Sequence, residues 1–201
     1  MIAPANSKEA QRQAAFQKRL RVPTAVAKQA VQQMMENFLR DVPLKEGAII
    51  AGYWHVNAEI NVLPLMVQLQ HKGYVCALPQ VMKKNAPLSF LRWDEKTPMR
   101  VNAYGIKEPV PTKSPLVRPD ILIVPMLAFD PEGSRLGYGM GYYDLTLRHL
   151  KAGAPMMAVG VAYDLQRMEQ VLAESTDCKM DIIVTDKKTY RFESSAAAHK
   201  L

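Results

Sequence analysis

The chain has 201 residues, enough for one sizeable hydrophobic core and few for two ordinary domains. Its hydrophobic content of 48% and charged content of 22% are ordinary for a globular protein and exclude a disordered chain. The net charge of +7 lies at the two ends, since residues 1–45 carry +5, residues 46–186 carry −1 and residues 187–201 carry +3, which disfavours a nucleic-acid-binding domain with one continuous basic face.

The first predicted element is a helix over residues 7–21, with Ser7 as its N-cap and Pro23 ending the pattern. Lys8 and Arg12 share one face of this helix, with Arg19 near the same side, so together they could bind a triphosphate. The alternative is a solvated basic face, which spacing alone ranks first. Residues 1–20 lack the apolar run of a secretory signal.

A second helix is predicted from Thr24 to about Arg40. A strand over residues 48–53, a helix over residues 60–71 and a strand over residues 74–78 follow, and this order is typical of a parallel sheet with crossover helices. The buried stripe of the second helix consists of Val31, Met34, Met35, Phe38 and Leu39.

Two residues follow the strand at 48–53 and are candidates for a ligand cleft, because ligands collect at the carboxyl ends of parallel strands. Trp54 offers a flat face for a heterocycle, and Glu59 accepts hydrogen bonds from N–H donors. The alternative is a packed tryptophan and an exposed glutamate. His55 we interpret as structural.

The middle of the chain is predicted to hold a short strand at residues 90–93 and a turn-rich return at 104–109. The proline-rich segment 109–119 is predicted to be a stiff surface connection to a buried strand at 121–124. The remaining predicted elements are a strand at 157–162, a short helix at 166–172, a strand at 181–185, an edge strand near Tyr190 and a flexible tail at 194–201, giving a sheet of about six or seven strands.

The stretch from Pro125 to Asp144 carries the strongest functional pattern. It runs from the buried strand through a loop with four glycines into a predicted helix at 142–150. Glycines at alternate positions and a helix N-terminus suit a phosphate, with Arg135 adding a full charge; a plain tight turn is the alternative. The spacing matches neither the P-loop nor the dinucleotide-binding fingerprint. Asp144, in the first helical turn, could hold Mg²⁺.

Cys76 and Cys178 lie far apart and form no metal-binding pattern, which indicates reduced thiols in a cytoplasmic protein. The longest near-apolar run, residues 121–129, is too short to span a bilayer.

The ordered set of motifs resembles the 5-formyltetrahydrofolate cyclo-ligase family, also called methenyltetrahydrofolate synthetase. The resemblance implies a three-layer α/β/α fold with a mostly parallel central sheet, formed by one domain over residues 1–201. It also implies conversion of 5-formyltetrahydrofolate to 5,10-methenyltetrahydrofolate, with ATP and Mg²⁺ required and ADP and phosphate released. The motifs are KxxxR at 8–12, Glu59, GYVCALP at 73–79, GIKEP at 105–109, PDILIVP at 119–125, LAFD at 127–130, RLGYGMGYYD at 135–144 and DCKMDIIVT at 177–185.

The resemblance also implies site residues. Lys8 and Arg12 are expected to contact ATP, Trp54 and Glu59 to bind folate, and Asp144 and Asp177 to bind Mg²⁺. The catalytic candidates are Arg135, Tyr142 and Tyr143. The loop expected to hold ATP comprises Arg135, Leu136, Gly137, Tyr138, Gly139, Met140, Gly141, Tyr142 and Tyr143, and its residues Tyr138, Gly139, Met140, Gly141 and Tyr142 are also expected to face folate.

Two positions depart from the family pattern. Met140 stands where the family often has glycine, and Thr176 precedes Asp177 where histidine is frequent. We expect small-molecule partners, no nucleic acid or membrane partner, and a monomer. Two alternatives stay open: a related ATP-dependent enzyme acting on another formylated or pterin-like substrate, and a non-catalytic basic module that binds RNA or a nucleotide.

Overall fold

The computed structural model describes residues 7–192, and the predicted flexible tail at 194–201 lies outside the described residues. The helices are α1 (Lys8–Leu20), α2 (Thr24–Asp41), α3 (Leu63–His71) and α4 (Tyr142–Gly153), with 3-10 turns η1 (Pro111–Lys113) and η2 (Asp164–Gln166). The strands are β1 (Ile49–Ala51), β2 (Val75–Gln80), β3 (Ser89–Arg92), β4 (Met99–Val101), β5 (Lys107–Pro109), β6 (Leu116–Val117), β7 (Ile121–Pro125), β8 (Ala128–Phe129), β9 (Arg135–Leu136), β10 (Met157–Val161), β11 (Ile182–Val184) and β12 (Thr189–Arg191).

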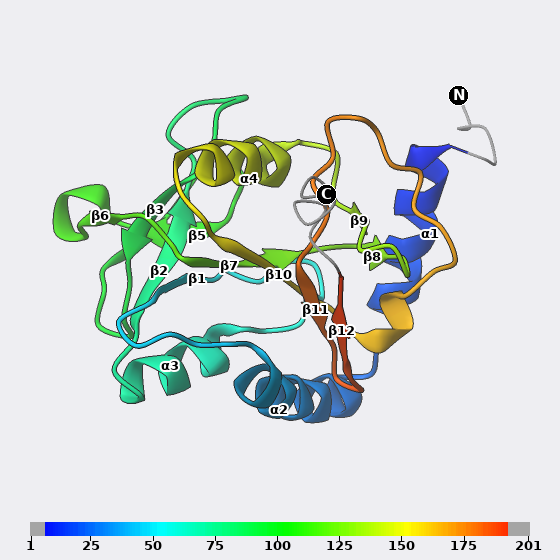
Figure 1. Cartoon of the computed structure of the whole chain (residues 1–201), viewed down its shortest axis with the longest axis horizontal. Coiled ribbons are helices and arrows are strands. Elements are labelled where there is room, and N and C mark those ends of the chain that lie inside the picture. Colours follow the sequence, from blue (N-terminus) through cyan, green and yellow to red (C-terminus); the bar gives the residue numbers. More distant parts are fainter. Residues whose placement is uncertain (1–6, 193–201) are drawn as a thin grey trace, which may run out of the picture.

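An eight-stranded sheet runs through the middle of the molecule in the order β12-β11-β10-β7-β1-β2-β3-β6 (Figure 1). The strands from β11 to β2 are parallel, whereas β12, β3 and β6 pair antiparallel at the two sides. The predicted α/β fold with a mostly parallel sheet is therefore confirmed.

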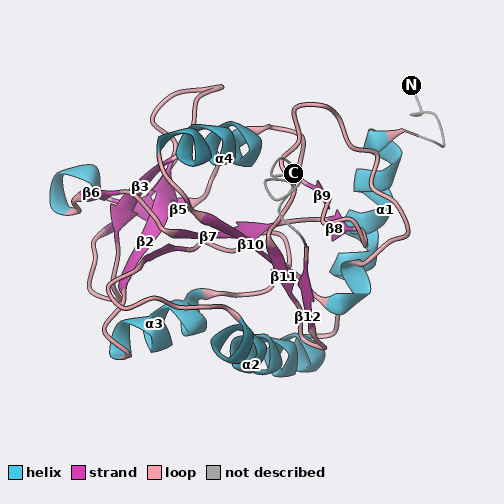
Figure 2. Ribbon diagram, in the orientation of Figure 1, coloured by secondary structure: helices cyan, strands magenta, loops and turns pink. Residues whose placement is uncertain are grey.

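Helices cover both faces of this sheet, with α2 and α3 on one face and α4 on the other (Figure 2). Helix α3 connects β1 to β2, and α4 connects β7 to β10, so the chain winds in opposite directions from the β1–β7 pair. A crevice forms where the winding direction reverses, at the carboxyl ends of these two strands.

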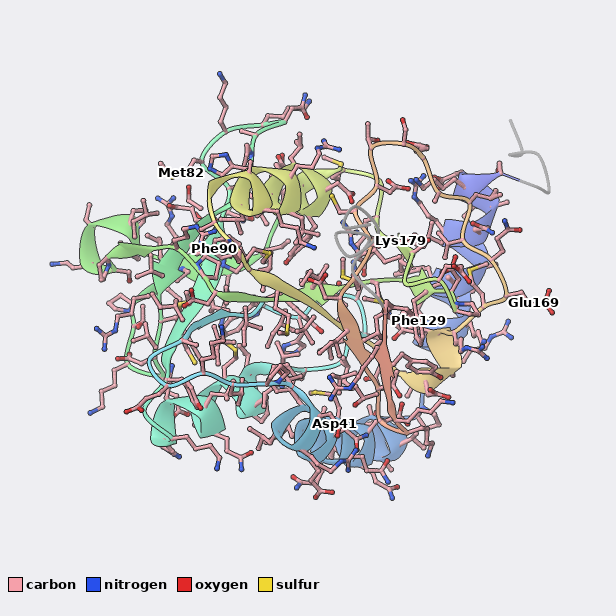
Figure 3. The ribbon with its side chains drawn as sticks, viewed as in Figure 1. Asp41, Met82, Phe90, Phe129, Glu169 and Lys179 are labelled. Atoms are coloured by element: carbon pink, nitrogen blue, oxygen red, sulfur yellow. The ribbon has the colours of Figure 1, made fainter. Side chains whose placement is uncertain are left out.

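The hydrophobic core lies on both sides of the sheet. Phe38, Met34 and Leu65 are fully buried under α2 and α3, and Leu147 is fully buried under α4. Phe90 and Phe129 also lie in the interior, whereas Glu169 projects from the periphery (Figure 3).

Helix α1 stands apart from the two layers, at the end of the molecule beside β8 and β9 (Figure 1). Its Ala15 and Phe16 pack on a separate apolar cluster that includes Leu136 and Val171. Its N-cap is Ser7, whose hydroxyl accepts from the Ala10 N–H at 3.2 Å, as the sequence predicts. This packing places the basic residues of α1 against the carboxyl-end crevice.

The predicted helix at residues 166–172 is wrong. The chain makes only the short turn η2 and then runs beside β8, where the Met168 N–H donates to the Phe129 carbonyl at 2.9 Å. The Asp130 carboxylate accepts a hydrogen bond from the Val171 N–H at 3.1 Å. These partners satisfy the backbone without helical hydrogen bonds.

The proline-rich segment 109–119 also differs from the prediction. It contains η1 and β6, and β6 pairs with β3 at the sheet edge, so the sheet has eight strands rather than six or seven. The return at 104–109 includes β5, which pairs with β4 as a separate hairpin.

Candidate active site

One cavity of about 460 Å³ opens at the carboxyl ends of β1 and β7. It is bordered by α1, the start of α4, the β4–β5 hairpin and the segment at 174–177. The predicted site residues that line it are Lys8, Arg12, Trp54, Glu59, Arg135, Gly137, Tyr138, Gly139, Met140, Gly141, Tyr142, Tyr143, Asp144 and Asp177. Leu136 is fully buried in the cluster beneath α1 instead.

Arg135 and Asp144 form an ion pair in this cavity, with Nη2 of Arg135 2.8 Å from Oδ1 of Asp144. The arginine side chain is 4% exposed. The Cys178 N–H donates to the same carboxylate oxygen at 2.9 Å, which brings the segment after Asp177 next to the first turn of α4. Strand β9 thus carries the guanidinium, and helix α4 supplies its carboxylate partner.

Lys8 and Asp177 form a second ion pair, with Nζ of Lys8 2.5 Å from Oδ2 of Asp177. Burial raises the pKa of Asp177, but the hydrogen bond from Lys8 and the N–H of Glu174 outweigh it, so the net pKa is lowered and the carboxylate is ionised. Lys8 is therefore not part of a solvated basic face.

Each of the two aspartates presents a further carboxylate oxygen. The hydrogen bonds among residues 7–192 engage Oδ1 of Asp144 and Oδ2 of Asp177, leaving Oδ2 of Asp144 and Oδ1 of Asp177 without a partner among those residues. The described residues also contain no group of three His, Cys, Asp or Glu side chains arranged to hold a metal. A cation here would complete its shell with ligand oxygens and water.

The glycine loop bends toward α1 before α4 begins. Gly139 has a φ of +92°, and Gly141, the N-cap of α4, has a φ of +70°. Nε of Arg12 donates to the Gly137 carbonyl at 3.1 Å, and a Cβ on Gly139 would lie 3.1 Å from the Arg12 guanidinium carbon. A side chain at Gly139 would therefore need a strained φ and a small shift of Arg12, and the N-terminus of α4 faces the cavity.

Glu59 is held by a tight turn after β1. The Val56 N–H donates to its Oε2 at 2.9 Å, while Asn57 and Ala58 take left-handed φ angles of 49° and 59°. Burial raises the pKa of Glu59 to about 7, although the Val56 N–H, Arg19 and Tyr138 each act to lower it. The alternative of an exposed glutamate is wrong, because Glu59 is 7% exposed.

The aromatic residues divide between the floor and the mouth of the cavity. Burial raises the pKa of Tyr143 well above its usual value, so its hydroxyl is neutral near neutral pH. At the mouth, the hydroxyls of Tyr142 and Tyr104 lie 2.7 Å apart and join α4 to the β4–β5 hairpin. Lys107 of the same hairpin lies 5.1 Å from the centre of the Trp54 ring.

Sequence reasoning missed the contribution of this hairpin. Asn102, Tyr104 and Ile106 line the cavity, and the hairpin is anchored by the buried Glu108, whose Oε1 accepts from Arg100 at 2.8 Å. Burial raises the pKa of Glu108, but hydrogen bonds from Arg100, Asn102 and Gln80 outweigh it and lower the net pKa. The sequence signal that could have indicated this hairpin was the GIKEP motif, which ends in Glu108 and Pro109.

Two arginines were also missed or misplaced. Arg148 lines the cavity one helical turn after Asp144, a spacing that could have indicated it. Arg19 was expected beside Lys8 and Arg12 on one basic face, but it is fully buried.

His55 is half-buried and stacks near Trp54, with ring centroids 6.3 Å apart, which agrees with a structural residue.

Comparisons with known proteins agree on one family. Residues 4–186 match the model of the 5-formyltetrahydrofolate cyclo-ligase family. The chain is 35% identical to a 5-formyltetrahydrofolate cyclo-ligase of Haemophilus influenzae, covering 78% of this chain and 86% of that protein. It is 32% identical to the enzyme of that name from Escherichia coli K12, covering 80% and 90%. Among solved structures, it is similar to a 5,10-methenyltetrahydrofolate synthetase from Aquifex aeolicus, with a TM-score of 0.78, 29% identity and 94% of each chain covered.

Proposed function

The chain belongs to the 5-formyltetrahydrofolate cyclo-ligase family and is an enzyme of that activity, and on this premise we propose how its own residues carry out the reaction. The substrates are 5-formyltetrahydrofolate and ATP, and the products are 5,10-methenyltetrahydrofolate, ADP and phosphate. The observation that carries the proposal is the single cavity, which Lys8, Arg135 and the glycine loop line together with Trp54 and Glu59.

ATP binds on the side of the cavity formed by α1 and the glycine loop. The N-terminus of α4 and the open backbone at Gly139 and Gly141 suit phosphate oxygens, because a phosphate accepts from N–H groups and is attracted to the positive end of a helix. Lys8 and Arg12 add positive charge from α1, so the nucleotide lies between two elements distant in sequence.

Asp144 and Asp177 are the residues that would hold Mg²⁺. The two carboxylates line one cavity, and Mg²⁺ is commonly bound by one or two carboxylates together with phosphate oxygens and water. When bound, the ion would neutralise charge on the phosphate oxygens. Arg135 and Lys8, which pair with these carboxylates, would then be drawn toward the phosphates.

Folate binds on the opposite side, against Trp54, Glu59 and the tyrosines of the loop. The ring of Trp54 provides a flat face, and the Glu59 carboxylate accepts from ring N–H groups. Tyr138 and Tyr142 line the same side, and Ile106 of the hairpin adds apolar surface. The reacting formyl group would then face the γ-phosphoryl of ATP.

The reaction proceeds by activation of an unreactive carbonyl oxygen. The formyl oxygen attacks the γ-phosphorus, the bond from that phosphorus to the bridging oxygen breaks, and ADP leaves. N10 of the same folate attacks the activated formyl carbon and gives up its proton. The C–O bond then breaks, and phosphate departs with that oxygen to leave the methenyl bridge.

Arg135 and the loop N–H groups stabilise the charge that develops on the phosphoryl oxygens. Fixed donors of this kind act more strongly where they are shielded from water, and Arg135 is almost fully buried. Tyr143, neutral and half-buried near Glu59, is the candidate donor to the formyl oxygen. Tyr142 is held by Tyr104 and serves in stacking against the folate.

The decisive experiment incubates the purified chain with 5-formyltetrahydrofolate, ATP and Mg²⁺ and follows the near-ultraviolet absorbance of the methenyl product together with ADP. Equal amounts of both products are expected. ADP release that depends on a different formylated compound, with no methenyl product from 5-formyltetrahydrofolate, would overturn the substrate assignment.

We also propose that the enzyme acts as a monomer in the cytoplasm. The cavity is lined by one chain, Cys76 and Cys178 are free thiols, and no helix in the described part of the chain is long and apolar enough to cross a membrane. Light scattering of the purified enzyme with and without ATP measures its oligomeric state.

A further inference from the structure

Arg19 is the one fully buried arginine among the described residues, and the mechanism above does not use it. It lies near the end of α1, and its side chain points into the protein below the cavity. Burying a guanidinium is costly unless its donors are satisfied. Its partners therefore indicate what the residue does.

The guanidinium donates to three segments that are distant in sequence. Nη1 donates to the Met126 carbonyl at 3.1 Å, and Nη2 donates to the Asn57 carbonyl at 2.8 Å and to the Tyr138 hydroxyl. Nε has no partner among the described residues. A planar group with several fixed donors can hold three acceptors in one relative arrangement, which a lysine cannot do.

Each of the three segments contributes to the cavity. Met126 follows β7, Asn57 lies in the left-handed turn that presents Glu59, and Tyr138 belongs to the glycine loop. The strained turn at Asn57 and Ala58 needs external support, because two consecutive non-glycine residues with positive φ are unfavourable. Arg19 supplies this support through the Asn57 carbonyl.

Arg19 also acts on Glu59 through charge. The titratable groups that face Glu59 are Arg19, Tyr53, Tyr138 and Tyr143. Burial dominates and raises the pKa of Glu59, while Arg19 is the one cation among these groups and lowers it.

We propose that Arg19 is a positioning residue for the folate side of the cavity, which fixes the turn at 56–59 and Tyr138 in one arrangement and holds the Glu59 carboxylate toward the substrate. This inference rests on the proposed function for the identity of the ligand. It predicts an effect on folate that is separate from any effect on ATP.

The test compares Arg19→Met with Arg19→Lys by calorimetric titration of 5-formyltetrahydrofolate and of a non-hydrolysable ATP analogue across the neutral pH range. In Arg19→Met, the folate Kd rises by about tenfold or more while the ATP-analogue Kd changes by less than about twofold. The pH midpoint at which folate binding strengthens moves upward, because Glu59 loses its cation. Arg19→Lys keeps this midpoint near that of the wild type and recovers only part of the affinity.

Two further variants separate positioning from general stability. Arg118→Met removes an exposed arginine that donates to the Leu150 and Ala154 carbonyls outside the cavity, and it leaves the folate midpoint unchanged. Arg19→Gln removes the charge of Arg19 but keeps amide donors for the backbone carbonyls and also moves the midpoint upward, which keeps the inference testable if Arg19→Met does not fold.

The inference is overturned if both ligands weaken alike in Arg19→Met, or if the midpoint stays fixed in both Arg19→Met and Arg19→Gln. If Arg19→Met does not fold, a fixed midpoint in Arg19→Gln overturns it. Wild-type protein that binds both ligands but forms no methenyl product contradicts the reaction and leaves the positioning role of Arg19 measurable by the same titrations.

Discussion

At the scale of single residues, the chemistry depends on which charges the cavity keeps ionised. Asp144 and Asp177 each form an ion pair, with Arg135 and Lys8, and hydrogen bonds from Lys8 and the Glu174 N–H lower the pKa of Asp177. Among residues 7–192, Glu59 has no such partner at hydrogen-bond distance, and burial raises its pKa to about 7. The two sides of the cavity therefore respond differently to pH and to substitution.

Asp144→Asn is expected to lower kcat by about a hundred- to a thousandfold, because it removes a charge beside the proposed position of the transferred phosphoryl group. The amide still fits beside Arg135 and Cys178, so the protein remains folded. Steady-state rates over a range of Mg²⁺ concentrations and a circular dichroism melt measure the two effects. Asp181→Asn is the matched control, since Asp181 pairs with Lys151 outside the cavity and its loss leaves kcat near that of the wild type.

Glu59→Gln is expected to change how stability depends on pH. The folded-state pKa of about 7 lies above the usual 4.5, so the folded protein binds the proton more tightly than the unfolded chain. The favourable contribution is complete below pH 4.5 and is lost as pH rises through 7, on the order of 3 kcal/mol for a shift of this size. Denaturant unfolding on either side of neutral pH measures it, and Glu59→Gln removes this loss.

Glu108→Gln is expected to change the pH dependence of stability with the opposite sign to Glu59→Gln. Burial raises the pKa of Glu108, but its hydrogen bonds from Arg100, Asn102 and Gln80 lower the net pKa, so its stabilisation is present at neutral pH and is lost in acid. If both variants altered stability in the same direction at neutral pH, the opposing environments of the two glutamates would be wrong.

The sequence predicted about half of the residues that line the cavity, but not the partners that hold them. Lys8, Glu59 and Asp177 could be named because their charges lie in motifs that resemble one family. The burial of Arg19 could not be predicted, because the position of a residue in a helix shows only which neighbours share its face. What packs against that face depends on how α1 docks.

At the scale of elements, the glycine loop is where α1 and α4 meet. Gly139→Ala is expected to weaken ATP binding by about tenfold and to lower stability by about 1 kcal/mol or more, since it combines a positive φ with a close approach to Arg12. Calorimetry and denaturant unfolding measure the two changes. Gly153→Ala, at the end of α4 with open space around its Cβ position, is the control and leaves stability equal or higher.

Elements with a strong internal pattern were predicted well, and elements defined by a distant partner were not. The helices near residues 7–21, 24–40 and 142–150 carry caps or apolar stripes and occur close to the predicted bounds. The segment after Gln166 has helix-forming residues, but the Phe129 carbonyl and the Asp130 carboxylate take its N–H groups. Strand β6 exists only because the edge of β3 is available.

At the scale of the whole molecule, the cavity is complete only when α1 is docked. Helix α1 packs on a small apolar cluster, and Arg12 and Lys8 then join it to the glycine loop and to the segment at 174–177. A ligand that contacts α1 and α4 together therefore stabilises the whole fold, because binding to the folded state shifts the unfolding equilibrium.

ATP with Mg²⁺ at about a hundred times its Kd should stabilise the wild type by about 2.7 kcal/mol, which for a chain of this length raises Tm by roughly 5–10 °C. Lys8→Gln should lose much of this shift, because it removes the charge that α1 supplies beside Asp177. Lys18→Gln, at an exposed position of the same helix, should keep it. Thermal melts with and without ATP and Mg²⁺ measure all three proteins. Equal shifts in the two variants would mean that Lys8 contributes no charge to the nucleotide site, and the cavity would then bind ATP through Arg12, the glycine loop and α4.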